Sequence, residues 1–286
     1  MEIIRSAGEM QSHAEKIRSS GKRIGVVPTM GYFHEGHTSL IRIARERCDV
    51  VVTTIFVNPA QFGTGEDFEQ YPRDFERDKA LAEEGGTDVI FAPDAEEMYP
   101  PGFGTFVVPE DGASILEGQV RPSHFRGVVT VVVKLFHLTK PHIAVFGQKD
   151  AQQVFVVRRM IRDLNFDIDL VVAPTIREQD GLAKSSRNLY LTAAERAEAP
   201  LLYQALKEAE SLAALGERKA EKIRAAVSEV LQRAKLATAD YVAVVDPETF
   251  REVGELHPPL ALVAVAVRFG SARLIDNILI SVSSKG

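Results

Sequence analysis

Short apolar runs alternate with helical patterns along the first part of this chain. The runs of strand length are Ile24–Val27, Val50–Val57, Asp88–Ala92, His142–Phe146 and Asp167–Ala173. Apolar residues recur at helical spacing in Thr38–Arg47, Phe75–Glu84, Val128–Thr139 and Ala151–Leu164. Strands that alternate with helices form a parallel sheet covered on both faces. The pattern predicts an α/β domain over residues 1–175, with a doubly wound parallel sheet that binds ligands at the carboxyl ends of its strands.

The pattern changes after Pro174. Two segments rich in alanine and glutamate read as helices, Thr192–Glu210 and Lys219–Lys235, and three strands follow at Tyr241–Val245, Leu260–Phe269 and Ile275–Ile280. Residues 176–286 are therefore predicted to form a smaller α+β domain. Its connecting segment, Arg177–Asn188, is well placed to close over a ligand.

Composition limits the classes of function. The formal net charge is −6 over 286 residues, and no lysine and arginine block resembles a nucleic-acid footprint. No apolar run is long enough to cross a bilayer, and the N-terminus lacks the features of a secretory signal. The single cysteine, Cys48, cannot form an intrachain disulfide. We expect a cytoplasmic protein that binds small anionic ligands in a local positive pocket, with neither nucleic acid nor membrane as a partner.

The most informative segment is Pro28-Thr29-Met30-Gly31-Tyr32-Phe33-His34-Glu35-Gly36-His37, between a predicted strand and a predicted helix. Free backbone N–H groups and the macrodipole attract anions at a helix N-terminus, and glycines allow close approach. His34 and His37 share one face of the first turn, where imidazoles can donate hydrogen bonds to phosphate. Two histidines can equally be surface or core residues, and the segment alone names no substrate.

Three further polar segments follow predicted strands or connect the domains. Gly147–Gln153 supplies a lysine, an acid and an amide, although an ordinary polar helix cap has the same composition. Asp180–Asn188 combines two hydroxyls with two cations, which suits a triphosphate and equally a solvated linker. Asn58–Gly63 supplies neutral amides for a polyhydroxy acid, although an Asn-Pro turn explains Asn58 as well.

An acidic stretch from Glu66 to Asp78 contains the candidate magnesium ligand, Asp78, among residues that otherwise read as solvated helix surface. Magnesium commonly keeps several waters and takes one or two carboxylates together with substrate phosphates, so a cage made only of protein is not expected. In a second charged loop, Arg121 and Arg126 are either ligand cations or partners of a neighbouring subunit. Neither a P-loop nor a Gly-x-Gly-x-x-Gly fingerprint is present.

Together these segments resemble the pantothenate synthetase (pantoate–β-alanine ligase) family. The resemblance runs in order from about Arg5 to Ile280, through the histidine segment and five further segments. These are Asn58-Pro59-x-Gln61-Phe62, Tyr71-Pro72-Arg73, Arg121-Pro122-x-His124-Phe125-Arg126-Gly127, Phe146-Gly147-x-Lys149-Asp150 and Ser185-Ser186-Arg187-Asn188. It implies a Rossmann-like domain of the nucleotidylyltransferase superfamily with a small C-terminal domain, as a cytoplasmic homodimer. It also implies condensation of (R)-pantoate with β-alanine through a pantoyl adenylate, using ATP and Mg²⁺ and releasing AMP and pyrophosphate.

The resemblance also implies roles for individual residues. His34 and His37 contact the phosphates, with His37 as proton donor, and Lys149 and Arg187 complete the implied catalytic set. The implied ATP-binding residues are Met30, Gly31, His34, Gly36, His37, Gly147, Lys149, Asp150, Ile176, Lys184, Ser185, Ser186 and Arg187. Gln61 and Gln153 hold pantoate, and its gem-dimethyl group meets an apolar wall of Val131, Val132 and Phe146.

One position departs from the family, which usually has methionine where this chain has Lys184. We expect the backbone of this position to contact ATP, so that the substitution is tolerated. Three alternatives remain: a nucleotidyltransferase that keeps the nucleotide in its product, an idle dimeric nucleotide-binding protein, and a fragment of an aminoacyl-tRNA synthetase. An idle binding protein would not need the whole set of His34, His37, Lys149 and Arg187. A synthetase fragment would need a tRNA-binding surface, which this acidic composition does not offer.

Overall fold

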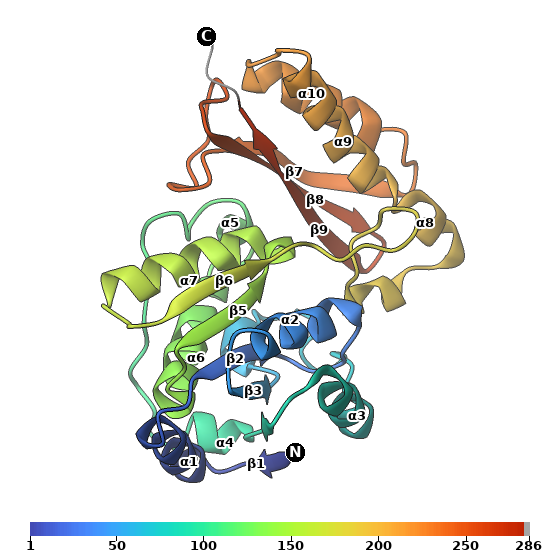
Figure 1. Cartoon of the computed structure of the whole chain (residues 1–286). Helices are drawn as coiled ribbons and strands as arrows, with labels where there is room; N and C mark the ends of the chain where they lie inside the picture. Colours follow the sequence, from blue (N-terminus) through green and yellow to red (C-terminus); the bar gives the residue numbers. More distant parts are fainter. Residues whose placement is uncertain (283–286) are drawn as a thin grey trace. The chain divides into compact units, whose positions relative to one another are not determined.

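The computed structural model describes residues 1–282, which divide into two compact units (Figure 1). The first unit comprises Met1–Gln148 and Val156–Pro174, and the second comprises Lys149–Phe155 and the residues from Thr175 onward. The described residues contain a parallel sheet in the first unit and an antiparallel sheet in the second. The predicted fold class, a Rossmann-like sheet with a smaller α+β domain, is confirmed.

The parallel sheet has the strand order β1-β4-β3-β2-β5-β6. Its strands are β1 (Glu2–Ile4), β2 (Ile24–Thr29), β3 (Val50–Ile55), β4 (Val89–Phe91), β5 (Ile143–Gly147) and β6 (Asp169–Ala173). Neighbouring residues of a strand point to opposite faces, and both Val26 and Val27 of β2 are fully buried. Burial on both faces explains why this strand is a continuous apolar run rather than an alternating one.

Helices cover this sheet and connect its strands (Figure 1). They are α1 (Ala7–Ser19), α2 (Glu35–Arg45), α3 (Phe75–Gly85), α4 (Ala95–Met98), α5 (Glu117–Val120), α6 (His124–Thr139) and α7 (Ala151–Asp163), with 3₁₀ turns η1 (Pro59–Gln61) and η2 (Gln148–Asp150). Helix α2 buries Ile41 and Ala44 in one apolar cluster with Val27 of β2 and Val51 of β3. Helices α1 and α6 also contact β2 and each other.

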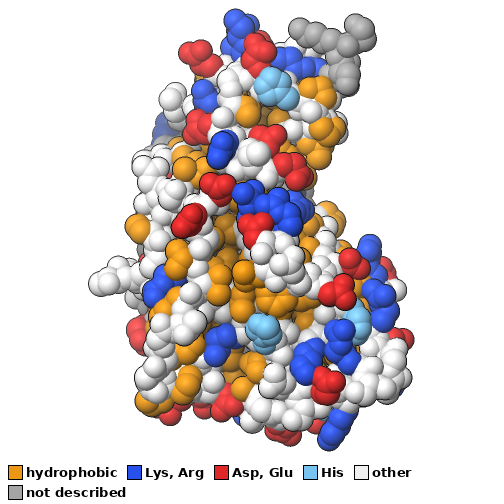
Figure 2. All heavy atoms as spheres, turned by 90° about the vertical axis from the view of Figure 1, so that its left-hand side faces the viewer, with side chains coloured by type: hydrophobic (Ala, Val, Ile, Leu, Met, Phe, Trp, Pro, Cys, Tyr) orange, Lys and Arg blue, Asp and Glu red, His pale blue; other side chains and the backbone are white. Residues whose placement is uncertain are grey.

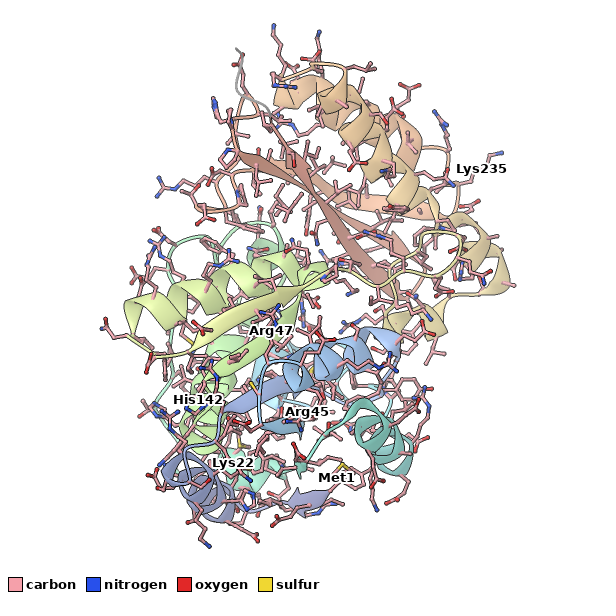
Figure 3. All side chains as sticks on the ribbon, viewed as in Figure 1. Met1, Lys22, Arg45, Arg47, His142 and Lys235 are labelled. Atoms are coloured by element: carbon pink, nitrogen blue, oxygen red, sulfur yellow. The ribbon has the colours of Figure 1, made fainter. Side chains whose placement is uncertain are left out.

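Polar contacts anchor the amino ends of the strands. Arg45 and His142, both labelled in Figure 3, lie at the end of α2 and just before β5. Arg45 pairs with Asp88 at 2.6 Å, and His142 Nδ1 accepts from the Ile24 N–H at 3.0 Å. The loops that carry the candidate site follow the opposite, carboxyl ends of the strands.

The second unit is built on the antiparallel order β7-β8-β9, with β7 (Ala237–Val245), β8 (Leu260–Phe269) and β9 (Ala272–Ser281). Its helical elements are η3 (Ser186–Tyr190), α8 (Ala193–Glu198), α9 (Leu201–Ala214) and α10 (Ala220–Leu231). Helices α9 and α10 bury their apolar faces against alternate residues of β8, Val263, Val265 and Val267. The residues on the other face of this central strand, Leu262, Ala264 and Ala266, are buried as well, so β8 is an almost continuous apolar run.

Several predicted boundaries were wrong. The helix expected at Thr192–Glu210 is two helices, because Pro200 lacks an N–H and serves as the N-cap of α9. Helix α2 begins at Glu35 instead of Thr38, and α6 begins at His124 instead of Val128. Strand β1 and helix α1 were not predicted. The apolar strand β1 is too short to produce a periodic signal of its own.

Candidate active site

The histidine segment forms a reciprocal cap at the start of α2. His34 is the N-cap residue, and His37 lies in the first turn of the helix. The Gly36 N–H donates to His34 Nδ1 at 3.1 Å, and the His34 N–H donates to His37 Nδ1 at 3.3 Å. The two ring centroids are 4.2 Å apart. Histidine replaces the usual Ser, Thr, Asp or Asn of a capping box, so the earlier start of α2 had no standard sequence signal.

This cap determines the tautomer of both imidazoles. A ring nitrogen that accepts a hydrogen bond cannot carry the proton, so a neutral ring with an accepting Nδ1 is protonated at Nε2. Both half-buried rings thus have a donating Nε2–H at the positive end of a helix. Gly36 is required there, because a Cβ at this position would lie 2.7 Å from His34 Cε1. The arrangement can donate hydrogen bonds to an anion.

The turn before the cap is supported by Asp78 of α3. This side chain is 1% exposed, and its carboxylate accepts from the Tyr32 N–H and the Phe33 N–H at 2.6 Å each. Asp78, the candidate magnesium ligand of the acidic stretch, thus has both carboxylate oxygens engaged by the backbone of this turn. Within residues 1–282, no group of three or more His, Cys, Asp and Glu side chains is arranged to hold a metal ion.

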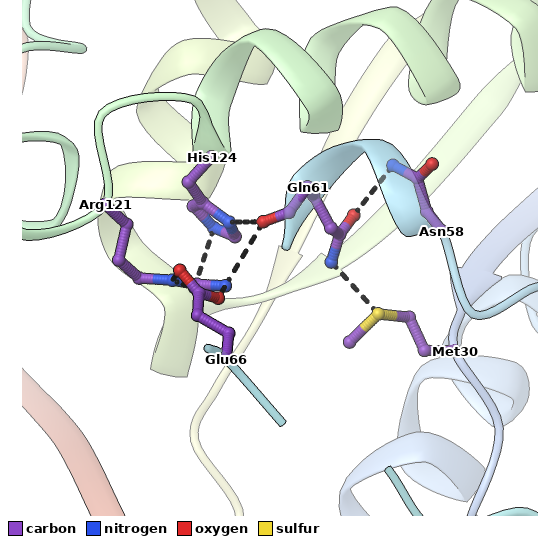
Figure 4. A network of polar contacts seen from close by, with 6 residues as sticks. All are labelled: Met30, Asn58, Gln61, Glu66, Arg121 and His124. Atoms are coloured by element: carbon purple, nitrogen blue, oxygen red, sulfur yellow. Dashed lines mark hydrogen bonds and ion pairs between the residues drawn. The ribbon is translucent and has the colours of Figure 1, made fainter. Parts of the chain in front are cut away.

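The loops after β2 and β3 meet at Gln61, as expected for the carboxyl edge of the sheet (Figure 4). Gln61 is 7% exposed, and its Nε2 donates to Met30 Sδ at 3.0 Å. Its Oε1 accepts from Asn58 Nδ2 at 3.1 Å, while Asn58 Oδ1 accepts from Tyr99 Oη at 2.7 Å. Asn58 also caps η1, as the turn interpretation of this residue expected, and it orients the Gln61 side chain in addition. The sequence did not predict the hydrogen bond from Tyr99 to Asn58.

A charged cluster holds the backbone of Gln61 (Figure 4). Arg121 Nη2 donates to the Gln61 carbonyl at 3.3 Å, and its Nε lies 2.9 and 3.0 Å from the two Glu66 oxygens. His124 Nδ1 lies 3.0 Å from the same carbonyl, which makes Nδ1 the protonated nitrogen. Burial, and then the Arg121 charge, lowers the pKa of His124 to about 4. Arg121 thus pairs with a carboxylate of its own chain, and its role toward a ligand or a neighbouring subunit stays a prediction.

The remaining predicted residues belong mainly to the second unit. Lys149 and Asp150 lie in η2, with Lys149 Nζ 3.6 Å from Asp150 Oδ1. The Lys149 carbonyl accepts from Asn277 Nδ2 of β9 at 2.9 Å. Gln153 lies half-buried in the first turn of α7, and Gly147 of the first unit ends β5. These contacts fix Lys149 to the antiparallel sheet.

The connecting segment is an ordered part of the second unit. The Lys184 N–H donates to the Ile176 carbonyl at 2.9 Å, beside a bridge between Arg177 and Ala183. Ser185 is the N-cap of η3 and accepts from the Arg187 N–H at 3.3 Å. Ser186 is buried in the first turn of η3. The segment is therefore a folded platform for hydroxyl and cationic side chains, and the interpretation as a solvated linker was wrong.

Charged side chains of both signs are mixed on the surface that Figure 2 draws. On the face drawn in Figure 2, Lys and Arg side chains lie among Asp and Glu side chains instead of forming one continuous basic area. No helix within residues 1–282 has both the length and the apolar character needed to span a membrane.

Comparisons with known proteins agree along the whole chain. The family model described as pantoate-beta-alanine ligase matches residues 2–279. A pantothenate synthetase of Thermotoga petrophila is 54% identical over 280 residues, 98% of this chain and 100% of that protein. A crystal structure of the enzyme from Thermus thermophilus has 46% identity and a TM-score of 0.92, covering 97% of this chain and 99% of that one.

A second solved structure carries ligands. The pantoate-beta-alanine ligase of Francisella tularensis, complexed with beta-gamma ATP and beta-alanine, has 32% identity and a TM-score of 0.81, with 98% of this chain and 97% of that chain covered. The resemblance stated from the sequence motifs is thereby confirmed. This chain belongs to the pantoate–β-alanine ligase family.

Proposed function

We propose that this protein condenses (R)-pantoate with β-alanine to give pantothenate, with conversion of ATP to AMP and pyrophosphate. The observation that carries the proposal is the reciprocal cap of His34 and His37 at the N-terminus of α2. It supplies two oriented Nε2–H donors at a helix end, which suits a polyphosphate. Family membership, and the nucleotide and beta-alanine bound by the Francisella relative, support the choice of substrates.

The reaction needs activation because a free carboxylate does not acylate an amine in water. A pantoate carboxylate oxygen attacks the α-phosphorus of ATP, and the bond to the bridging oxygen breaks, so pyrophosphate leaves with the electron pair. The amine of β-alanine then attacks the acyl carbon of the adenylate and displaces AMP. Negative charge grows on the departing phosphate in the first step, and the Nε2–H groups of His34 and His37 are proposed to stabilise it.

The other assignments extend this proposal. Lys149, Lys184, Ser185, Ser186 and Arg187 offset the charge of the triphosphate, and Gly147, Asp150 and Ile176 frame the nucleotide. Gln61 binds pantoate, because its amide is buried at the carboxyl edge of the sheet and is oriented by Asn58. The role of Gln153 in the same site stays a prediction.

Mg²⁺, the homodimer and the cytoplasmic location are also proposals. Magnesium neutralises polyphosphate charge. Because Mg²⁺ commonly takes only one or two carboxylates together with substrate phosphates, we propose that it enters bound to the triphosphate. No step above depends on a ligand that the protein supplies to the metal.

The test is exchange of labelled pyrophosphate into ATP, with Mg²⁺ present and β-alanine absent. Exchange that requires pantoate, followed by AMP release when β-alanine is added, is the expected result. A folded protein that binds ATP but shows no exchange would refute the ligase proposal. Transfer of the nucleotide to a phosphate acceptor would favour another activity of the superfamily.

A further inference from the structure

Asp78 lies in an unusual place for an acidic residue near an ATP site. It belongs to α3, yet both carboxylate oxygens point at the backbone of the β2–α2 turn, 45 and 46 residues earlier in the chain. Oδ1 accepts from Phe33 and Oδ2 from Tyr32, each at 2.6 Å. Burial raises the pKa of Asp78, and the two backbone N–H groups oppose that shift. The residue is therefore part of the turn's own structure.

The turn needs this support because its backbone is strained. Gly31 has φ +84°, and Tyr32 has φ +51°, the left-handed region that a bulky residue seldom adopts. A Cβ at Gly31 would lie 2.9 Å from Asp78 Oδ2 and 3.2 Å from Ile55 Cγ2. Two successive N–H groups directed at one carboxylate resemble an anion-binding nest, and here the anion is the protein's own side chain.

The nest is joined directly to the histidine cap. Phe33 is fully buried, stacks on His37 with a centroid distance of 5.2 Å, and immediately precedes the N-cap His34. Any change in the path of the turn therefore moves both rings and breaks the contacts that keep Nδ1 accepting and Nε2 donating. Because a misplacement of about 1 Å can cost on the order of a hundredfold in rate, the turn's geometry matters for catalysis.

We propose that Asp78 is a positioning residue for the adenylation step, which holds the Gly31–Phe33 turn so that His34 and His37 present Nε2–H to the phosphates. It acts through the backbone and is not a ligand of magnesium. The rate measurements below rest on the proposed function, whereas the spectroscopic measurements do not.

The test compares Asp78→Asn with the matched control Glu76→Gln. Both changes remove one negative charge from α3, but the Glu76 side chain is 83% exposed. The asparagine side chain has one acceptor oxygen, so it keeps one of the two backbone hydrogen bonds. Its NH₂ group then faces the other backbone N–H, and two donors face each other. We expect kcat for pantoate-dependent exchange to fall at least about tenfold in Asp78→Asn, with the Mg²⁺ half-saturation and the pantoate KM within about twofold of wild type. Glu76→Gln should match wild type.

Two NMR measurements on the wild-type protein test the geometry without relying on a folded variant. The amide protons of Tyr32 and Phe33 should resonate far downfield and exchange slowly, as expected for short bonds to a carboxylate. Long-range ¹H–¹⁵N correlations should identify both histidines as Nε2–H tautomers. If Asp78→Asn folds, this tautomer signal should change in the variant and persist in Glu76→Gln.

Unchanged kcat in a folded Asp78→Asn, or Nδ1–H tautomers in the wild type, would overturn the proposal. Activity that excess Mg²⁺ restores would also overturn it and would make Asp78 a metal ligand. If the wild type shows the expected amide and tautomer signals but no exchange, the proposed function fails while the structural role of Asp78 stands.

Discussion

The ion pair between Arg177 and Asp276 anchors the connecting segment to the antiparallel sheet of the second unit. Asp276 lies on β9 with a side chain only 1% exposed, and it accepts from Arg177 Nη1 at 2.6 Å and Nη2 at 3.0 Å. Arg177 also donates to the Gly181 carbonyl at 3.1 Å and lies 4.0 Å from the centre of the Tyr203 ring. The change Asp276→Ala therefore removes the main anchor of the segment that carries Ser185 and Arg187.

The expected cost follows from the burial of the pair. Removing one member of a buried ion pair costs about 3–5 kcal/mol, because the other charge is left without compensation. The Arg177 side chain is 17% exposed and keeps its contacts to Gly181 and Tyr203, so we expect the lower limit, about 3 kcal/mol. The double variant Arg177→Met with Asp276→Ala leaves no buried charge and should recover at least about half of that loss.

The assay is native-state hydrogen exchange of the β9 amides, since two units need not unfold in one transition. The half-saturation for ATP in the exchange reaction should rise in Asp276→Ala. Glu210→Gln, which removes an exposed partner of Lys207 on α9, is the control and should change stability by at most about 0.5 kcal/mol. A loss below about 1 kcal/mol for Asp276→Ala, or an equal loss in the double variant, would refute the reasoning.

Three further predictions concern single positions. His124 binds its proton with a pKa near 6.5 when unfolded and about 4 when folded, so its stabilisation is complete above pH 6.5 and is lost as the pH falls to about 4. Urea denaturation should give about 2 kcal/mol less stability at pH 5 than at pH 7.5, and His124→Gln should abolish that part of the difference. Gly127→Ala should cost about 3 kcal/mol in thermal unfolding, because its Cβ would lie 2.2 Å from the Ala60 carbonyl oxygen, whereas Gly254→Ala, with no atom within 4 Å, should be nearly neutral. Lys184→Met should change the ATP half-saturation less than about tenfold, because the backbone of this residue is held by Ile176, and a larger change would show that the side chain reaches the phosphates.

The sequence by itself determined the order of the main elements. Continuous apolar runs and helical spacing are local signals, and they placed β2, β3, β5, α3 and α10 close to their observed positions. The His-x-Gly-His segment is also local, because a cap is made by residues a few positions apart. Its family resemblance could therefore be recognised from the order of the amino acids, and its role as a phosphate site stays a prediction.

The tertiary structure decided which polar side chains support the site. From the sequence, Asp78 was a candidate magnesium ligand, Glu66 a solvated surface charge, and Arg121 a ligand cation or subunit partner. Nothing local distinguishes a charged side chain that faces water or a ligand from one that faces a distant part of its own chain. Their partners lie 45 to 60 residues away in the chain. Only the tertiary fold brings α3, the Glu66 loop and the end of α5 to the carboxyl edge of the sheet, where these charged residues support the histidine cap and Gln61.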